Sequence, residues 1–430
     1  MARTVAGLPA GTRLSDYITL GVIAERIPRR MVDDILREEE RESERIRKLP
    51  AHVVVYYVIA LAIYMNVSYG EVLRCLLEGL AWLGRPVRQL RQTTKSAISH
   101  ARTRLGYEPM RRLYRELVAP VATDRTLGAW YRSPVPDRGP QAPSWRLVSL
   151  DGSTLDVPDE TANVDVFGRP GTAHGKSAFP QLRFVSLVEC GTHVIFAAAE
   201  GPFSFSEVHL TRSVLPQLTP GMLCLADRNF FGYDLWHEAA STGADLLWRV
   251  RLDAALPVTE SLQDGSFLST IYASAKDRRS DHDGTPVRVI EYELVDDVGN
   301  RVTPGSKDNH YRLLTTILDP EAAPASDLAR LYHERWEAEN AFDEFKTHLR
   351  GRATVLRSRT PALVRQEFYG FLLAHYVIRG LMHEAALAAD IDPDEVSFVH
   401  SVRVIRRKIQ ASVRHRGTAP FSPSGNRHVA

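Results

Sequence analysis

Apolar and polar residues alternate along the chain in a way that predicts helices first, strands next and helices again at the end. The first 48 residues include a highly charged helical stretch over 15–48, and the apolar run Val53–Met65 follows it. That run has thirteen residues, fewer than the roughly 20 needed to cross a bilayer. We therefore expect a buried helix there, followed by an amphipathic helix near 68–82.

From residue 145 the pattern is typical of β-strands. Two short apolar runs each end on a carboxylate: Leu147–Leu150 before Asp151, and Met222–Ala226 before Asp227. A hairpin is predicted around Glu189-Cys190-Gly191. The remaining elements expected in this part are strands at 182–188, 192–199 and 246–250, and helices at 205–218 and 233–242.

The segment 251–318 is strand-like and broken by turn pairs such as Asp264-Gly265 and Asp283-Gly284, which indicates an inserted β-rich part. A long helix is expected over 326–349 and another over 361–388, with a disordered tail after 415. We divide the chain into a helical N-terminal DNA-binding domain (1–128), a linker (129–144), the first part of an α/β core (145–250), a β-rich insertion (251–320), the second part of the core (321–390) and a C-terminal region (391–430).

Composition and charge narrow the class of protein. The 430 residues are 44% hydrophobic and 25% charged, as in ordinary globular proteins. No signal peptide is evident, and the three cysteines share no metal-ligand spacing, so we expect a reduced cytoplasmic protein without a membrane anchor. Residues 1–150 hold 24 Lys and Arg against 15 Asp and Glu, residues 151–350 hold 18 against 31, and residues 351–430 hold 12 against 6. Basic flanks around an acidic centre suit phosphate binding outside and cation binding inside.

The stretch from Arg85 to Arg115 is the most basic part of the chain, with nine basic residues, one acidic residue and several hydroxyls. Such side chains contact DNA phosphates, and Arg88, Arg91 and Lys95 are our candidates for this role. A solvated pair of basic helices would show the same pattern, and the sequence leaves that alternative open.

Three carboxylates are candidate ligands for a divalent ion: Asp151, Asp227 and Glu339. Mg²⁺ and Mn²⁺ prefer oxygen ligands, but an acidic chain offers many such triples. The helix that carries Glu339 is more informative, because the spacing places its neighbours Tyr332, Arg335 and Lys346 within roughly 60° of it on a regular helix. Salt pairs on a solvated surface would give the same spacing.

The order Tyr-x2-Arg-x3-Glu-x6-Lys resembles the signature of DDE transposases of the bacterial insertion sequence 4 family. Two further blocks are similar to those of the family: Asp151-Gly152-Ser153, and Leu225-Ala226-Asp227-Arg228-Asn229-Phe230. The N-terminal 120 residues are similar to the helical domain that precedes the catalytic core in these enzymes, so the resemblance covers nearly the whole chain.

This resemblance implies an α/β fold with a ribonuclease-H-like mixed sheet. Asp151 would lie on the first strand, Asp227 just after the fourth, and Glu339 on a helix after a β-rich insertion. It also implies two Mg²⁺ or Mn²⁺ ions, with Asp151 touching both and the other two carboxylates holding one each.

The resemblance also implies which residues meet DNA. Tyr332, Arg335 and Lys346 would grip phosphates near the element end, and Arg228 follows the second aspartate as in the family. Some relatives stack a flipped base on an aromatic residue of the insertion. Tyr311 is the candidate here, although this chain has no tryptophan in that region. Trp336 is expected to pack against the protein instead.

These observations predict a cut-and-paste DNA transposase that binds terminal inverted repeats and target DNA, acts as a homodimer on DNA and is associated with the nucleoid. The alternative is a transposase-derived repressor that binds DNA and has lost catalysis. A glycosidase with paired carboxylates is a third hypothesis, but it gives no role to the basic stretch at 85–115.

Overall fold

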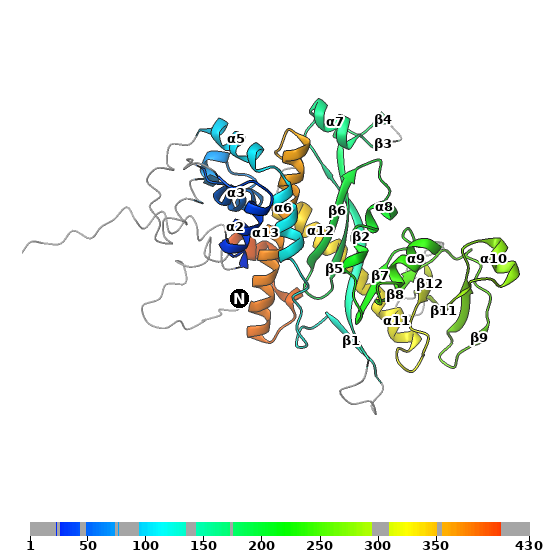
Figure 1. The fold of residues 1–430 in the computed structure, drawn as a ribbon. Helices are drawn as coiled ribbons and strands as arrows, with labels where there is room; N and C mark the ends of the chain where they lie inside the picture. Colours follow the sequence, from blue (N-terminus) through cyan, green and yellow to red (C-terminus); the bar gives the residue numbers. More distant parts are fainter. Residues whose placement is uncertain are drawn as a thin grey trace, which may run out of the picture.

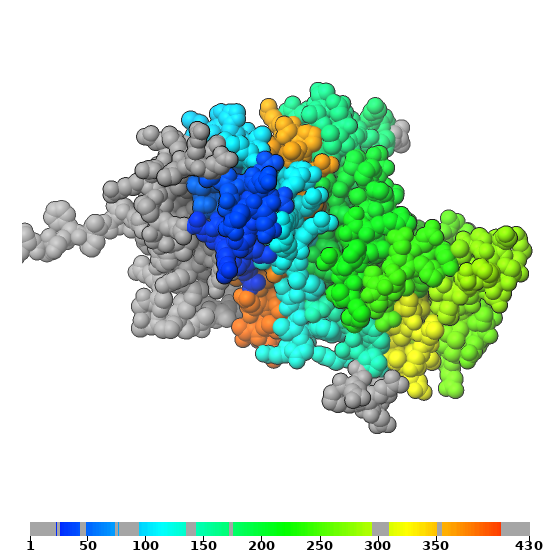
Figure 2. Space-filling model, viewed as in Figure 1, coloured from blue at the N-terminus to red at the C-terminus, as the bar shows by residue number. Residues whose placement is uncertain are grey.

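The protein consists of a bundle of helices packed against one edge of a large mixed sheet, from whose other edge a smaller β-rich part projects (Figures 1 and 2). The computed structural model describes residues 26–43, 49–73, 94–134, 143–172, 175–294, 309–350 and 355–405, together with Ile23 and Leu76. Arg88 and Arg91, much of the helix predicted near 68–82 and the tail after residue 415 lie outside the described residues.

The N-terminal helices surround one apolar helix. They are α2 (Arg29–Glu38), α3 (Ala51–Ile63), α5 (Lys95–Leu105) and α6 (Glu108–Leu117). All residues of α3 from Val53 onward are buried, because α3 packs between α2, α5 and the long C-terminal helix α13 (Pro361–Ala389). The prediction of a buried core helix in this run is confirmed. Among the described helices, none is long and apolar enough to cross a membrane.

Helix α13 joins the two halves of the molecule. It contacts α3, α5 and α6 on the N-terminal side, and strand β6 and helix η6 on the side of the sheet (Figure 1). Pro361 stands at its start, where a missing N–H costs nothing, and 18 of its residues are buried. The N-terminal helices and the core therefore share one apolar interior.

The strands of the main sheet run in the order β6-β5-β2-β7-β8-β12-β11-β10-β9, and β1 pairs with β2 beside this path. Their bounds are β1 (Trp130–Arg132), β2 (Ser144–Asp156), β5 (Gln181–Glu189), β6 (Val194–Pro202), β7 (Met222–Ala226), β8 (Asp245–Arg249), β9 (Glu260–Ser261), β10 (Phe267–Ile271), β11 (Thr285–Glu293) and β12 (His310–Thr315). A separate hairpin is formed by β3 (Gly171–Thr172) and β4 (Gly175–Lys176). Strand β2 is antiparallel to β5 and parallel to β7, which is parallel to β8.

The central strands are covered on both faces, which explains their nearly continuous apolar sequences. Successive residues of a strand point to opposite faces. Thus Cys224 and Ala226 of β7 join the large core shared with α13, whereas Leu223 and Leu225 pack on the other face with Leu328 and Tyr332. The predicted mixed α/β sheet is confirmed.

The β-rich part formed by β9–β12 continues the main sheet. Strand β12 pairs antiparallel with β8, with Leu313 opposite Arg249 and Leu314 opposite Trp248. The backbone groups on that side of β8 thereby find partners, and the insertion and the core share one hydrogen-bonded ladder.

The helix predicted over 326–349 is present but irregular. It consists of α11 (Ala325–Leu331), the 3₁₀ turn η5 (Tyr332–Trp336), α12 (Glu337–Asp343) and the π-helical turn η6 (Glu344–Leu349). Each change of helix type alters the rotation per residue, so the face predicted from a regular helix holds only in part.

Three local expectations differ from the structure. The helix predicted over 205–218 is divided into α8 (Glu207–Thr211) and η3 (Leu215–Gln217), because Pro216 lacks the N–H that an α-helix requires there. Part of the predicted linker forms β1, whose Tyr131 stacks on Trp145 of β2. Trp336, expected to pack, is instead 51% exposed.

Of the remaining described helices, only α9 (Tyr233–Ala240) corresponds to a predicted helix (233–242), and the other three are short and were not predicted. Those three are α7 (Thr161–Phe167), α10 (Ala275–Ser280) and η7 (Pro393–Glu395).

Candidate active site

Asp151 and Asp227 are brought together by the parallel pairing of β2 with β7. In that register Leu150 lies opposite Ala226. The next residue on each side is an aspartate, so the two carboxylates leave neighbouring strands at the same level, where backbones are about 5 Å apart. The two aspartates are close because of the register between β2 and β7. The sequence motifs around Asp151 and Asp227 do not specify that register.

The carboxylate of Asp151 is largely buried. The N–H of Gly152 donates to its Oδ1 at 2.8 Å, and Nη1 of Arg335 donates to its Oδ2 at 3.2 Å. Burial raises the pKa of Asp151 to about 6, and the negative charges of Glu339 and Asp227 act in the same direction. The Gly152 N–H and the Arg335 guanidinium oppose this shift. The negative charges of Glu339 and Asp227 therefore reach the Asp151 carboxylate.

Asp227 lies in the turn after β7 and is partly exposed. The backbone N–H of Asn229 donates to its Oδ1 at 2.6 Å, which fixes one side of the carboxylate. The carbonyl of the preceding residue, Ala226, accepts from the hydroxyl of Tyr332 at 3.4 Å. The end of β7 is thus held by contacts on both sides of Asp227.

Glu339 joins this pair through Arg335. One guanidinium nitrogen of Arg335 donates to Asp151, and the other, Nη2, donates to Oε1 of Glu339 at 3.3 Å. Arg335 is buried, whereas the Glu339 side chain is 45% exposed. A single guanidinium therefore links the carboxylate on β2 to the carboxylate on α12.

The remaining residues of the predicted helical face lie at different depths. Tyr332 is buried beneath the sheet, and burial raises the pKa of its hydroxyl. Lys346 is half-buried in the π-helical turn, where its Nζ donates to the hydroxyl of Ser153 at 2.7 Å. Burial, followed by the positive charge of Arg350, lowers the pKa of Lys346.

The donor set suits a hard divalent cation, because it consists of carboxylate oxygens. The carboxylate oxygens of Asp151, Asp227 and Glu339 do not all lie within 4.8 Å of one another. Among the described residues, the only three potential ligands that meet this distance lie elsewhere. An arrangement with two ions does not require that closeness, because each ion then takes ligands from two carboxylates.

Comparisons with known proteins agree with this geometry. Residues 144–377 match the family model for the transposase DDE domain, and residues 17–115 match the model for the N-terminal domain of insertion element 4 transposases. The first match covers more than half of the chain. The chain belongs to the DDE transposase family.

Two proteins of Escherichia coli strain K12 are similar to this transposase. It is 26% identical over 407 residues to the transposase InsG of insertion sequence element IS4, across 93% of this chain and 83% of that protein. It is 25% identical over 229 residues to the putative transposase InsZ, across 53% of this chain and 70% of that protein. The predicted family and its ribonuclease-H-like fold are confirmed. Membership of the family implies DNA binding and a requirement for divalent metal.

The candidate DNA contacts of this transposase are spread over several elements. Arg228 is exposed in the turn after Asp227, and Lys95 is exposed at the start of α5. Arg88 and Arg91 lie outside the described residues. Arg335 and Lys346 thus lie near the Asp151 carboxylate, whereas Lys95 lies on the N-terminal helices.

Tyr311, the candidate for base stacking, lies between two neighbours in the sheet. Its ring stacks on Tyr292 of β11 with 5.1 Å between centroids, and the guanidinium of Arg249 on β8 lies 3.9 Å from its centroid. Because β11 and β8 flank β12 on opposite sides, these two groups cover opposite faces of the ring. A base would have to displace one of them to stack on Tyr311.

Sequence patterns missed two features of the site. Ser153 receives the Lys346 ammonium, and Glu207 at the start of α8 lies against Gly152, where an added Cβ would come within 2.8 Å of its Oε1. Both contacts join segments that are far apart in the sequence. The Asp-Gly-Ser block marked Ser153 as part of a motif, but no signal in the sequence pointed to Glu207.

Proposed function

We propose that this transposase cuts DNA at the ends of its element and joins the freed 3′ end to target DNA, with Asp151, Asp227 and Glu339 as the metal ligands. The observation that supports this most is the register of β2 and β7, which sets the two aspartates side by side. The link from Asp151 through Arg335 to Glu339 adds the third carboxylate.

The ions we propose are two Mg²⁺ or Mn²⁺ per active site. All three ligands offer oxygen, which these ions prefer over softer donors. When bound, such ions activate the attacking water or hydroxyl and stabilise the leaving oxygen of the phosphodiester. The negative charges of both Asp227 and Glu339 raise the pKa of Asp151. Asp151 is therefore our candidate for the ligand that both ions would share.

The basic residues of the site have separate roles in this proposal. Arg335 presents a planar set of donors next to the carboxylates, which suits a phosphate oxygen pair. Lys346 supplies a second positive charge near Ser153, and the exposed Arg228 can meet the backbone beside Asp227. Tyr332 holds the end of β7 through the Ala226 carbonyl, and the phosphate contact that the family resemblance implies for it would require this buried hydroxyl to become accessible.

We further propose that Lys95, Arg88 and Arg91 contact the terminal inverted repeats, that Tyr311 serves any flipped base, and that two copies assemble on paired element ends at the nucleoid. The basic N-terminal stretch supports the first part of this proposal. Sedimentation of the protein with and without an end duplex tests the homodimer. A single copy per bound pair of ends would contradict it.

Cleavage of a labelled duplex that carries a terminal repeat tests the catalytic assignment. With Mg²⁺ or Mn²⁺ we expect cleavage by the wild type and at least a hundredfold loss in Asp151→Asn, because a metal ligand is removed. The matched control is Asp165→Asn, an exposed aspartate on α7 that should cleave at the wild-type rate. Cleavage by Asp151→Asn at that same rate would overturn the assignment.

The alternative of a repressor that has lost catalysis is distinguished by metal uptake. Titration calorimetry of Mn²⁺ should give tighter binding to the wild type than to Glu339→Gln. Negligible uptake by both proteins, together with retained binding of the repeat, would favour the repressor.

A further inference from the structure

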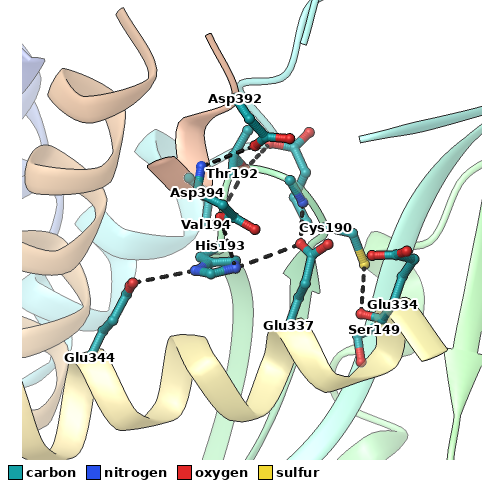
Figure 3. Close-up of polar contacts among 12 residues, drawn as sticks. Ser149, Cys190, Thr192, His193, Val194, Glu334, Glu337, Glu344, Asp392 and Asp394 are labelled. Carbon is teal, nitrogen blue, oxygen red and sulfur yellow. Dashed lines mark hydrogen bonds and ion pairs between the residues drawn. The ribbon is translucent and has the colours of Figure 1, made fainter. Parts of the chain in front are cut away.

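A second group of potential metal ligands lies at the start of α12, and we call it the His193 cluster. It consists of His193, Glu337 and Asp394 (Figure 3). His193 lies in the turn between β5 and β6, Glu337 begins α12, and Asp394 lies in η7 after α13. Three elements that are distant in the sequence therefore meet at one point.

The distances within the His193 cluster suit a small metal ion. His193 Nε2 lies 3.2 Å from Oδ1 of Asp394 and 3.6 Å from Oε2 of Glu337, and the three ligand atoms are all within 4.8 Å of one another. Bonds of about 2.0–2.1 Å in a tetrahedron set ligand atoms roughly 3.3 Å apart. Two of the three separations are thus already close to that value.

The imidazole of His193 directs one buried ring nitrogen to this point. His193 is only 4% exposed, and its Nε2 lies within ion-pair distance of both carboxylates but makes no well-directed hydrogen bond with a described residue (Figure 3). Buried polar atoms without a hydrogen-bond partner are uncommon in native proteins and indicate a missing water or ion. The ring nitrogen and the two carboxylates therefore meet without a well-directed hydrogen bond between them.

The opposite ring nitrogen is held by buried charged groups. Nδ1 of His193 lies 3.3 Å from Oε1 of Glu344, and the guanidinium of Arg379 contacts both of these groups. A carboxylate that accepts from the far N–H orients a metal-binding histidine and directs the lone pair of the near nitrogen to the ion. Glu344 can accept in this way in the tautomer with the proton on Nδ1, in which Arg379 donates to Glu344 and not to the ring.

Negative charge exceeds positive charge around the His193 cluster. Glu344 is already paired with Arg379, whose Nε donates to it at 2.8 Å, and with His375 at 3.2 Å. Glu337 accepts from the backbone N–H of Gly191 and lies beside Glu334, and the charge of the Arg379 guanidinium reaches Asp394. The carboxylates of Glu334, Glu337, Glu344 and Asp394 still outnumber the one guanidinium, and a bound dication would offset this excess.

We propose that His193, Glu337 and Asp394 bind a transition-metal dication of the Zn²⁺ type, at a site separate from the catalytic carboxylates. One imidazole nitrogen with two carboxylates matches the ligands that Zn²⁺ accepts, whereas Mg²⁺ favours oxygen alone. The Asp394 side chain is 41% exposed, which gives the ion a path from solvent and leaves a fourth position for water.

A metal in the His193 cluster would tie three parts of the catalytic core together. Glu337 lies two residues before Glu339, and Cys190 and His193 belong to the turn that packs on the same helix. The ion would link the start of α12 to the β5–β6 turn and to η7, and so restrain the helix that carries Glu339. This inference concerns metal binding and does not depend on the proposed cleavage reaction.

Calorimetric titration of the full-length, metal-stripped protein with Zn²⁺ tests the proposal, in an Asp151→Asn and Asp227→Asn background with Mg²⁺ in excess. We expect one Zn²⁺ per chain, and affinity at least about tenfold lower when Asp394→Asn is added. Glu395→Gln is the matched control, because it removes an exposed carboxylate of the same turn that is not part of the cluster. It should bind as tightly as the background protein.

His193→Gln provides a second variant, and Co²⁺ provides a second measurement. Tetrahedral Co²⁺ with a nitrogen ligand gives visible absorption bands, which should appear in the background protein and be lost in both His193→Gln and Asp394→Asn. Circular dichroism of each variant verifies that it is folded. Absence of Zn²⁺ binding, or binding unchanged by both substitutions, would overturn the proposal.

Discussion

At the scale of single residues, Asp151 carries an electrostatic cost that its proposed role explains. Its carboxylate is buried and feels the charge of two other carboxylates. Its cationic partner, Arg335, also donates to Glu339. A group that served only stability would not be placed in this way, because ionising it costs free energy. Metal ligands in active sites accept this cost, since the ion restores the balance of charge when it binds.

The pH dependence of stability follows from the raised pKa of Asp151. Its pKa is about 6 in the folded chain against 3.8 ordinarily, so the folded state holds the proton more tightly. The resulting stability is fully present below about pH 4 and is lost as pH rises through about 6, by about 3 kcal/mol at most. In EDTA at about pH 8, Asp151→Asn should therefore unfold at a higher temperature than the wild type.

Thermal unfolding of both proteins across this pH range provides the measurement. The advantage of Asp151→Asn should shrink toward zero near pH 4, where the wild-type carboxyl is protonated as well. The exposed control Asp165→Asn should show no such trend. An advantage that stays constant with pH would mean that burial of charge is not its cause.

At the scale of elements, the turn between β5 and β6 depends on one glycine. Gly191 has φ +75°, and an added Cβ would lie 2.5 Å from the carbonyl oxygen of Leu127 and 2.7 Å from the nitrogen of Ala129. Both neighbours are backbone atoms and cannot turn aside. The N–H of Gly191 also donates to Glu337, so the same turn positions the start of α12.

Gly191→Ala should therefore be strongly destabilising. We expect a loss of about 3 kcal/mol or more in the free energy of unfolding, measured by chemical denaturation followed through tryptophan fluorescence. Gly221→Ala is the matched control, because Gly221 has φ +85° with no atom near an added Cβ. Its loss should be the backbone strain alone, about 1–2 kcal/mol. If both variants lost the same free energy of unfolding, the backbone around residue 191 would have moved to make room for the added Cβ.

The elements also show what could be predicted from the sequence and what could not. Strands that end on Asp151 and Asp227 could be read from local apolar runs, and so could the helix bearing Glu339. The register that aligns Leu150 with Ala226 could not, because it depends on pairing between distant segments. The 3₁₀ turn that buries Tyr332 is likewise set by packing, whereas the sequence argument assumed a regular helix.

At the scale of the whole molecule, a buried polar network fastens the N-terminal helices to the core. Arg102 of α5 donates to Gln366 of α13 at 2.9 Å and to Ser358 at 2.9 Å, and Gln366 donates back to the Arg102 carbonyl at 3.0 Å. Arg102 belongs to the basic stretch that predicted DNA binding, but it is only 4% exposed. Its charge supports the structure and is not available to phosphates.

Arg102 and the exposed basic residues should therefore respond differently to substitution. Arg102→Gln should lower the free energy of unfolding by about 1–3 kcal/mol, because it leaves buried polar partners unsatisfied. The slope of log DNA affinity against log salt should not change. Joint neutralisation of Arg88, Arg91 and Lys95 should instead flatten that slope by about 0.9 for each phosphate that the protein no longer neutralises.

Filter binding at several salt concentrations and chemical denaturation supply the two measurements. Arg104→Gln is the control for stability, since Arg104 is an exposed neighbour on the same helix. A flatter salt slope in Arg102→Gln would show that this guanidinium reaches DNA after all. An unchanged slope in the triple variant would place the DNA contacts elsewhere.

The pairing of β12 with β8 bears on how small a working enzyme of this kind can become. If residues 251–320 were removed, β8 would present a row of unpaired N–H and C=O groups along its open side. Such an edge pairs readily with another copy and leads to self-association. A shortened transposase would therefore need a replacement strand or charged residues along β8 to avoid self-association.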